Sequence, residues 1–123
     1  AKCFDCHFSP DFTGDEFRNI GLFDKNQFLD KGRFEVTKDS ADLGKFKVPG
    51  LRNVAVTPPY MHNGMFSTLE EVVEYYDNPT KFVAHSINAD SLLQKPLGLT
   101  VQEKSDLVEF MKALTDFRFI KNN

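Results

Sequence analysis

The run Cys3-Phe4-Asp5-Cys6-His7 places two thiols three positions apart, with an imidazole directly after the second thiol. This C-x-x-C-H pattern is typical of the covalent attachment of a c-type haem. Each cysteine can add to one vinyl group of the porphyrin, and the histidine can then bind the iron as its proximal ligand. Cys3, Cys6 and His7 are therefore predicted to hold one covalent haem c.

Two other kinds of site use a C-x-x-C pair, and the sequence favours neither of them. A thioredoxin-like redox pair lies in a βαβ context, and no such pattern follows Cys6. A structural zinc site usually takes a second Cys or His pair at close spacing, whereas His62 and His85 are single and far along the chain. Zinc and a redox dithiol remain the alternatives to haem.

Length and composition indicate one modest domain. The chain has 123 residues, a net charge of −3, 13 Phe, 3 Tyr and no Trp. This length predicts a single domain over residues 1–123. The charge gives no indication of a nucleic-acid surface, and no apolar run is long enough for a membrane span. An aromatic-rich core suits a porphyrin pocket, although phenylalanine also fills ordinary small cores. Both cysteines belong to the haem motif, so no disulfide is expected.

Two amphipathic helices are predicted. The first begins with Ser67 and Glu70 as a capping box and runs to about Asp77. Its apolar positions follow a helical period, which leaves Tyr75 off the buried face formed by Leu69, Val72, Val73 and Tyr76. The second helix begins at Thr100 with Glu103 as its partner and ends near Thr115. Its predicted buried side consists of Leu107, Val108, Phe110, Met111 and Leu114.

The rest of the chain is predicted to be mainly loop. Residues 8–32 and 78–99 are polar or interrupted by Gly and Pro. Residues 33–36 and 45–48 alternate between polar and apolar, which favours a short β-hairpin around residues 37–44.

The sixth ligand of the iron decides the chemistry, because a protein ligand there favours electron transfer and an open position allows peroxide or a gas to bind. Spacing alone favours Met61 or Met65, which follow the stiff Pro58-Pro59 pair. Tyr76 is a further candidate, because a phenol on a buried helix face needs a partner. The remaining candidates are His62, which follows Met61 directly, His85 as a solvated loop residue and Met111 as core packing.

Several further motifs occur in one order along the chain. They are Phe46-Lys47-Val48-Pro49, Leu51-Arg52-Asn53-Val54, Thr57, Pro59-Tyr60-Met61-His62-Asn63-Gly64, residues 68–73 and residues 99–115. Together they resemble the bacterial di-haem cytochrome c peroxidases and their MauG-like relatives, over nearly the whole chain. The resemblance is to the C-terminal, electron-relay haem domain of that family. It implies an all-α, cytochrome c-like haem domain with long loops, and leaves room for the short hairpin.

The resemblance changes the predicted sixth ligand. The family's distal ligand lies at the position of Tyr76, counted from His62, and MauG-like enzymes carry an iron-binding tyrosine there. A phenolate stabilises oxidised iron and lowers the reduction potential, whereas a thioether raises it. The expected ligands are therefore His7 and Tyr76, with Met61 or Met65 as alternatives.

Other site residues also follow from the resemblance. Relatives bind calcium partly through backbone carbonyls at the positions of Thr57 and Pro59, and carbonyl oxygens are suitable hard ligands. Lys47 and Arg52 are candidate partners of the haem propionates, with ordinary surface charge as the equal alternative. His62 is expected near the haem edge.

The parent protein is accordingly expected to be a periplasmic di-haem oxidoreductase whose N-terminal domain carries the peroxide-reacting haem. Only Ala1 and Lys2 precede Cys3, whereas small c-type cytochromes place a helix before this motif. The chain is therefore expected to be part of a longer protein, without its first helix, and to transfer electrons to a redox partner with little peroxidase turnover. The alternative function is a stand-alone mono-haem carrier with His/Met ligation.

Overall fold

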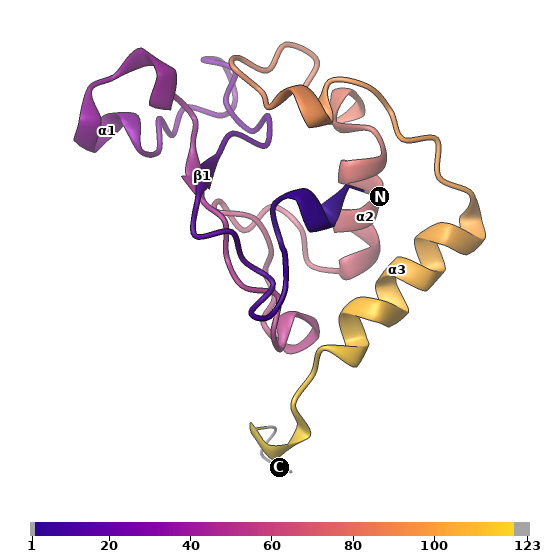
Figure 1. Ribbon diagram of the computed structural model, residues 1–123. Helices are drawn as coiled ribbons and strands as arrows, with labels where there is room; N and C mark the ends of the chain where they lie inside the picture. The colour runs from indigo at the N-terminus through magenta and orange to yellow at the C-terminus, as the bar shows by residue number, and fades with distance from the viewer. Residues whose placement is uncertain (1, 120–123) are drawn as a thin grey trace.

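The computed structural model describes residues 2–119, so the predicted domain 1–123 extends beyond them at both ends (Figure 1). The predicted all-α fold class is confirmed. The regular structure in this range is mainly helical, and long loops join the helices. It consists of the helices α1 (Phe34–Thr37), α2 (Leu69–Asp77) and α3 (Val101–Ala113), the strands β1 (Phe17–Arg18) and β2 (Phe46–Lys47), and short 3-10 helices at Cys3–Asp5, Ser40–Asp42, Val54–Val56, Pro79–Lys81, Ser91–Leu93 and Phe117–Phe119. No helix among residues 2–119 is long and apolar enough to cross a membrane.

Helix α2 begins with a capping box one residue later than predicted. The Thr68 hydroxyl accepts a hydrogen bond from the Glu71 N–H at 3.2 Å, and the Glu71 carboxylate accepts one from the Thr68 N–H at 3.0 Å. The predicted pair, Ser67 and Glu70, was wrong because the sequence offers two adjacent hydroxyls and two adjacent glutamates at the same spacing. The box that forms leaves Leu69 buried at the first helical position.

Helix α3 begins as predicted. The Thr100 hydroxyl accepts from the Glu103 N–H at 3.2 Å, and the Glu103 carboxylate accepts from the Thr100 N–H at 2.8 Å. The helix ends at Ala113, slightly before the predicted end near Thr115. Phe110 was wrongly assigned to the buried side, because its side chain is 51% exposed and meets Phe12 edge-on at 6.2 Å between ring centroids.

Helix α2 is covered on two sides. Toward α3, Leu69 and Val73 pack against Val108. On the other side, Tyr75 joins a second buried cluster that also contains Leu22, Phe66 and Val83. The loops supply this second cover, so the amphipathic pattern of α2 underestimates how much of the helix is buried.

A charged cluster joins the end of α2 to α3. Lys104 donates to the carboxylates of Asp77 at 2.8 Å and Glu74 at 2.7 Å. Asp77 also accepts a hydrogen bond from the Leu99 N–H at 2.9 Å, and it is buried, with 6% of its surface exposed. These bonds, led by the one from Lys104, lower the pKa of the Asp77 carboxyl below its usual value. Both helices are thus fixed at the end of α2 that carries Tyr75 and Tyr76.

The lowered pKa of Asp77 makes stability depend on pH. A carboxyl with a lower pKa in the folded state stabilises the fold above its unfolded pKa of about 4, and this contribution is lost as the pH falls through the folded pKa. We expect Asp77→Asn to lower the free energy of unfolding of the haem-loaded protein at pH 7, and to lower it less at about pH 3. Denaturant unfolding at both pH values measures this, with the exposed Asp106→Asn on α3 as control. An equal loss at both pH values would contradict the assignment.

The predicted hairpin is wrong in its first strand. Residues 34–37 form α1, which ends at Lys38 in the left-handed conformation with φ 57°. Asp39 then caps the next 3-10 helix by accepting from the Ala41 N–H at 2.9 Å. Strand β2 pairs instead with β1, antiparallel, with Arg18 opposite Phe46. Four alternating residues cannot distinguish a strand from one helical turn, and the polar residues after them favour local turns.

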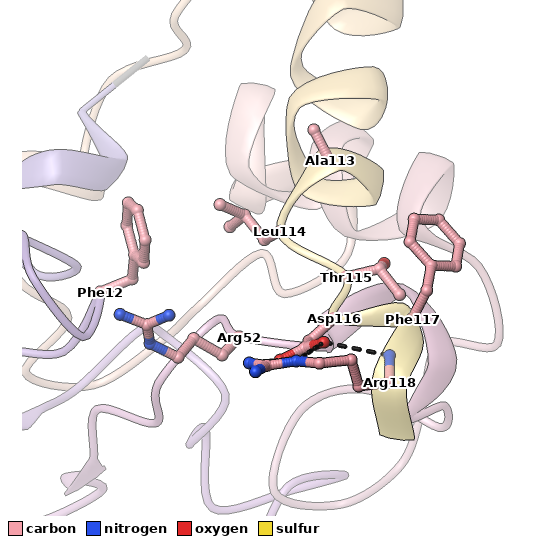
Figure 2. A pocket seen from close by; sticks show the side chains of 8 residues that line it. All are labelled: Phe12, Arg52, Ala113, Leu114, Thr115, Asp116, Phe117 and Arg118. Atoms are coloured by element: carbon pink, nitrogen blue, oxygen red, sulfur yellow. Dashed lines mark hydrogen bonds and ion pairs between the residues drawn. The ribbon is translucent and has the colours of Figure 1, made fainter. Parts of the chain in front are cut away.

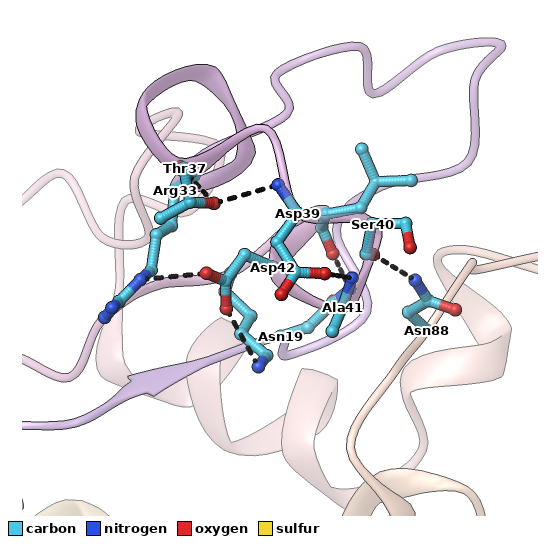
Figure 3. A network of polar contacts seen from close by, with 10 residues as sticks. Asn19, Arg33, Thr37, Asp39, Ser40, Ala41, Asp42 and Asn88 are labelled. Carbon is cyan, nitrogen blue, oxygen red and sulfur yellow. Dashed lines mark hydrogen bonds and ion pairs between the residues drawn. The ribbon is translucent and has the colours of Figure 1, made fainter.

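A buried asparagine holds the loops together. Asn19 donates to the carbonyls of Leu43 at 3.0 Å and Ile87 at 2.8 Å, and its side-chain oxygen accepts from the Gly21 N–H at 2.8 Å. Only 2% of its surface is exposed. Figure 3 shows Asn19 beside the Asp42 network and the exposed Asn88. Three loop segments that lack regular structure are therefore clamped by one side chain.

Candidate haem site

The C-x-x-C-H motif forms a compact turn at the N-terminal end of the described chain. The N–H groups of Cys6 and His7 both donate to the Cys3 carbonyl, at 3.2 and 2.8 Å. Both cysteines are free thiols, with Cys3 exposed and Cys6 half-buried. Burial raises the pKa of the Cys6 thiol. The turn presents two protonated thiols and one imidazole from adjacent positions, which is the donor set that covalent haem attachment requires.

The ring of His7 is held in one tautomer. Its Nδ1 lies 3.0 Å from the Phe12 carbonyl oxygen, and because a carbonyl only accepts, Nδ1 carries the proton. Burial lowers the pKa of His7, and its hydrogen bond to the Phe12 carbonyl partly offsets this. The imidazole is therefore neutral at pH 7, and Nε2 keeps its lone pair free for a metal.

Helix α2 brings Tyr76 to the motif. The burial of its phenol raises the pKa of Tyr76, and the proximity of the Cys3 and Cys6 thiols raises it further. The phenol therefore lies within electrostatic range of both thiols. In Figure 1 the N-terminal turn, in indigo, is drawn against α2.

The hydroxyl groups of the three tyrosines differ in their partners. Tyr60 donates to the Val54 carbonyl at 3.0 Å, and Tyr75 donates to the Ile20 carbonyl at 2.5 Å. The Tyr76 hydroxyl makes no hydrogen bond to any residue between 2 and 119. A phenol without a hydrogen-bond partner, within electrostatic range of the two thiols, is suited to bind iron, since hard oxygen donors favour oxidised iron.

The prediction for Tyr75 was wrong. It was expected off the buried face of its helix, yet none of its surface is exposed, whereas Tyr76 is half-buried. The loop around Ile20 and Gly21 covers the side of α2 that the apolar pattern assigned to solvent.

The other candidate iron ligands lie in different surroundings. Met61 and Met65 are half-buried against the cluster around Tyr75, and the Met65 sulfur accepts a weak contact from the Asn63 amide at 3.8 Å. His62 stacks on Phe46, with ring centroids 3.6 Å apart and 12° between the planes. Met111 packs between α2 and α3, and His85 is exposed. The two methionines and Tyr76 pack against the same buried cluster, so the methionines stay alternatives.

Lys47 and Arg52 make ion pairs with the loop that follows His7. The Lys47 ammonium lies 2.8 Å from the Asp15 carboxylate. Arg52 donates to the Pro10 carbonyl at 2.9 Å and to the Asp11 carboxylate at 3.3 Å. Arg52 also lines a pocket between Phe12 and the residues after α3 (Figure 2). Binding of haem propionates by these two residues stays a prediction.

Thr57 and Pro59 are exposed and follow the 3-10 helix Val54–Val56. Residues 2–119 contain no group of three or more His, Cys, Asp or Glu side chains placed to hold a metal ion. A calcium ion here would therefore depend on backbone carbonyls, and its binding also stays a prediction.

Sequence reasoning missed two groups that support the site. The Phe12 carbonyl that orients His7 carries no sequence signal, because every residue has a carbonyl. Asn19 could have been noticed only as a polar residue directly before an apolar run, since its partners are distant backbone atoms.

No family model matches the chain. It is 35% identical to the cytochrome-c peroxidase IdrP1 of Pseudomonas sp. (strain SCT), over 94% of this chain and 37% of the relative. It is 34% identical to the methylamine utilization protein MauG of Methylorubrum extorquens, over 93% of this chain and 31% of the relative. The chain thus spans well under half the length of the relatives it matches.

Solved structures of the same kinds of protein have a similar fold. A MauG-like protein associated with microbial copper homeostasis superposes with a TM-score of 0.80 at 37% identity, over 94% of this chain and 42% of that one. The diheme peroxidase BthA from Burkholderia thailandensis shares the fold, with a TM-score of 0.75 at 22% identity over 96% of this chain and 40% of that one. The chain therefore belongs to the family of di-haem cytochrome c peroxidases and MauG proteins, whose members bind c-type haem, and it matches a segment of them consistent with one haem domain.

Proposed function

We propose that this chain is the electron-relay haem domain of a MauG-like di-haem oxidoreductase. In this proposal it corresponds to the C-terminal domain and holds one c-type haem through Cys3, Cys6, His7 and Tyr76. The haem, when bound, supplies a one-electron iron couple. The parent protein would use it to relay oxidising equivalents from a peroxide-reacting haem in another domain.

The observation that supports this most strongly is the position of Tyr76. Its phenol lies within electrostatic range of both cysteine thiols and has no hydrogen-bond partner within residues 2–119, while the hydroxyls of Tyr60 and Tyr75 each donate to a backbone carbonyl. A hydroxyl left free near a motif that attaches haem is a ready oxygen donor. Tyrosine ligation would lower the reduction potential and favour the oxidised state.

The residues of the chain have separate tasks in this proposal. Cys3 and Cys6 fix the position of the porphyrin through two thioether bonds. His7, whose Nδ1 is bonded to the Phe12 carbonyl, presents Nε2 to the iron. Tyr76 would be the second protein ligand of the iron, and a haem with two protein ligands favours electron transfer over direct reaction with peroxide.

Three further parts of the proposal concern the parent protein. Its second haem domain would be the partner of this chain and would pass electrons to and from it. Its compartment would be the periplasm, where c-type haem is attached in bacteria. Calcium would bind between the domains, with the carbonyls of Thr57 and Pro59 among its ligands.

A stand-alone mono-haem carrier with His/Met ligation is the second candidate. The chain contains a single C-x-x-C-H motif. Met61 and Met65 also pack against the cluster that contains Tyr75, as Tyr76 does. Methionine ligation would give a higher potential, suited to accepting electrons from other carriers.

The spectrum of the oxidised, haem-loaded protein separates the two candidates. After a haem assay for one covalent haem, we expect optical and EPR spectra of six-coordinate iron without the charge-transfer band of methionine ligation. Tyr76→Phe should change these spectra, because it removes the donor oxygen. Tyr60→Phe removes a phenol bonded elsewhere and serves as the matched control. A methionine band in the unmodified protein would return the chain to the second candidate.

A further inference from the structure

Tyr75 is anchored more firmly than its neighbour on α2. It has no exposed surface, and its hydroxyl donates to the Ile20 carbonyl at 2.5 Å. Its ring lies 5.6 Å from the rings of Phe66 and Phe82 and 5.5 Å from that of Tyr76, measured between centroids. The Tyr75 and Tyr76 rings meet at 79°, edge to face. Movement of either ring is therefore coupled to the other.

The acceptor of this hydrogen bond is itself held in place. The Asn19 side-chain oxygen accepts a hydrogen bond from the Gly21 N–H at 2.8 Å, and Gly21 directly follows Ile20. The Asn19 amide also donates to the carbonyls of Leu43 and Ile87 in two further loops. Gly21 has φ +94°, and a Cβ there would lie 3.2 Å from the Tyr75 hydroxyl. Glycine is required both by the backbone conformation and by the close approach of the phenol. The Ile20 carbonyl is thus a fixed point on the loop, rather than part of a mobile segment.

A fixed direction for Tyr75 also fixes the direction of Tyr76. Successive side chains on an α-helix are separated by about 100° of rotation. On the side of α2 that faces α3, the helix is held by the packing of Leu69 and Val73 against Val108 and by the ion pairs of Lys104 with Asp77 and Glu74. On the opposite side the directional restraint is the hydrogen bond from Tyr75, one residue from Tyr76.

We propose that Tyr75 is a positioning residue, which holds the Tyr76 phenol toward Cys3 and Cys6 through its own hydrogen bond to the Ile20 carbonyl. This inference rests on the proposed function, in which Tyr76 binds the iron. Loss of the bond removes this restraint, so the last turn of α2 can shift on the side away from α3. Tyr76 would then be held less firmly as a ligand.

Competition by added imidazole for the sixth position tests this in the haem-loaded protein. We expect Tyr75→Phe to raise the apparent affinity for imidazole about tenfold, as loss of one buried hydrogen bond allows, and to shift the spectrum away from that of the unmodified protein. Gly21→Ala disturbs the same bond from the acceptor side and should act in the same direction. Val73→Ala, which is buried on the α3 side of α2, lowers stability without changing the affinity for imidazole.

The outcomes separate this inference from the proposed function. If Tyr76→Phe changes the spectrum while Tyr75→Phe and Gly21→Ala keep the imidazole affinity of the unmodified protein, Tyr75 is not a positioning residue. An equal rise with Val73→Ala would show general loosening of α2 and would also overturn the role of Tyr75. If Tyr76→Phe itself leaves spectrum and affinity unchanged, Tyr76 is not the ligand and the proposed function fails first.

Discussion

Tyr76→Met is expected to raise the reduction potential of the haem by on the order of a few hundred millivolts, a sizeable part of the ~0.8 V that axial ligands span. An anionic phenolate stabilises the oxidised iron, and a neutral thioether stabilises the reduced iron. The substitution keeps a long side chain at the same position of α2, within electrostatic range of Cys3 and Cys6. An equilibrium redox titration followed optically measures the change.

Two comparisons make this result specific. Tyr60→Met alters a tyrosine whose hydroxyl is bonded to the Val54 carbonyl, and should leave the potential near that of the unmodified protein. Replacement of Met61 and Met65 together by leucine should also have little effect if Tyr76 is the ligand. A potential that stays constant in Tyr76→Met but shifts in the double leucine variant would assign the ligand to a methionine.

Asn19→Ala is expected to lower the free energy of unfolding of the haem-loaded protein by about 3 kcal/mol or more. The side chain makes three hydrogen bonds, to Leu43, Ile87 and Gly21. A buried polar group left without its partner costs roughly 1–3 kcal/mol, and total stability is typically about 5–15 kcal/mol. Urea unfolding with circular dichroism and haem absorbance as parallel probes measures the loss.

Asn88→Ala is the matched control for Asn19→Ala. Asn88 is exposed and donates one longer hydrogen bond, to the Ser40 carbonyl at 3.3 Å. Its removal should cost less than about 0.5 kcal/mol, as for most surface changes. If the two variants are equally stable, the loops around Asn19 are held by other contacts.

Features encoded by local sequence could be predicted, and those that depend on distant contacts could not. The Thr100–Glu103 capping box uses residues within a few positions of one another, and its prediction is confirmed. The hairpin prediction failed because the true partner of residues 46–47 lies at residues 17–18. No local pattern connects those two segments.

In the candidate site, too, local features could be predicted and features that depend on distant contacts could not. Tyr76 could be assigned to a helix and placed on its inward side, since α2 has a clear period and cap. The burial of Tyr75 could not be predicted, because the loop at Ile20 that covers it lies 55 residues away in sequence. Hydrogen bonds to backbone carbonyls, such as those from His7 and Asn19, depend on the folded path of the chain and not on the identity of the acceptor residue.

The clamp at Asn19 also affects the order in which this fold can assemble. Its bond to Ile87 joins residues 68 apart, and its bond to Leu43 joins residues 24 apart. Closing such loops costs conformational entropy, and this cost arises before the contacts can stabilise the fold. The bond between Lys104 and Glu74 closes a loop of 30 residues between two self-capped helices. Asn19 therefore reaches its final surroundings only when the segments around Leu43 and Ile87 have both closed onto it.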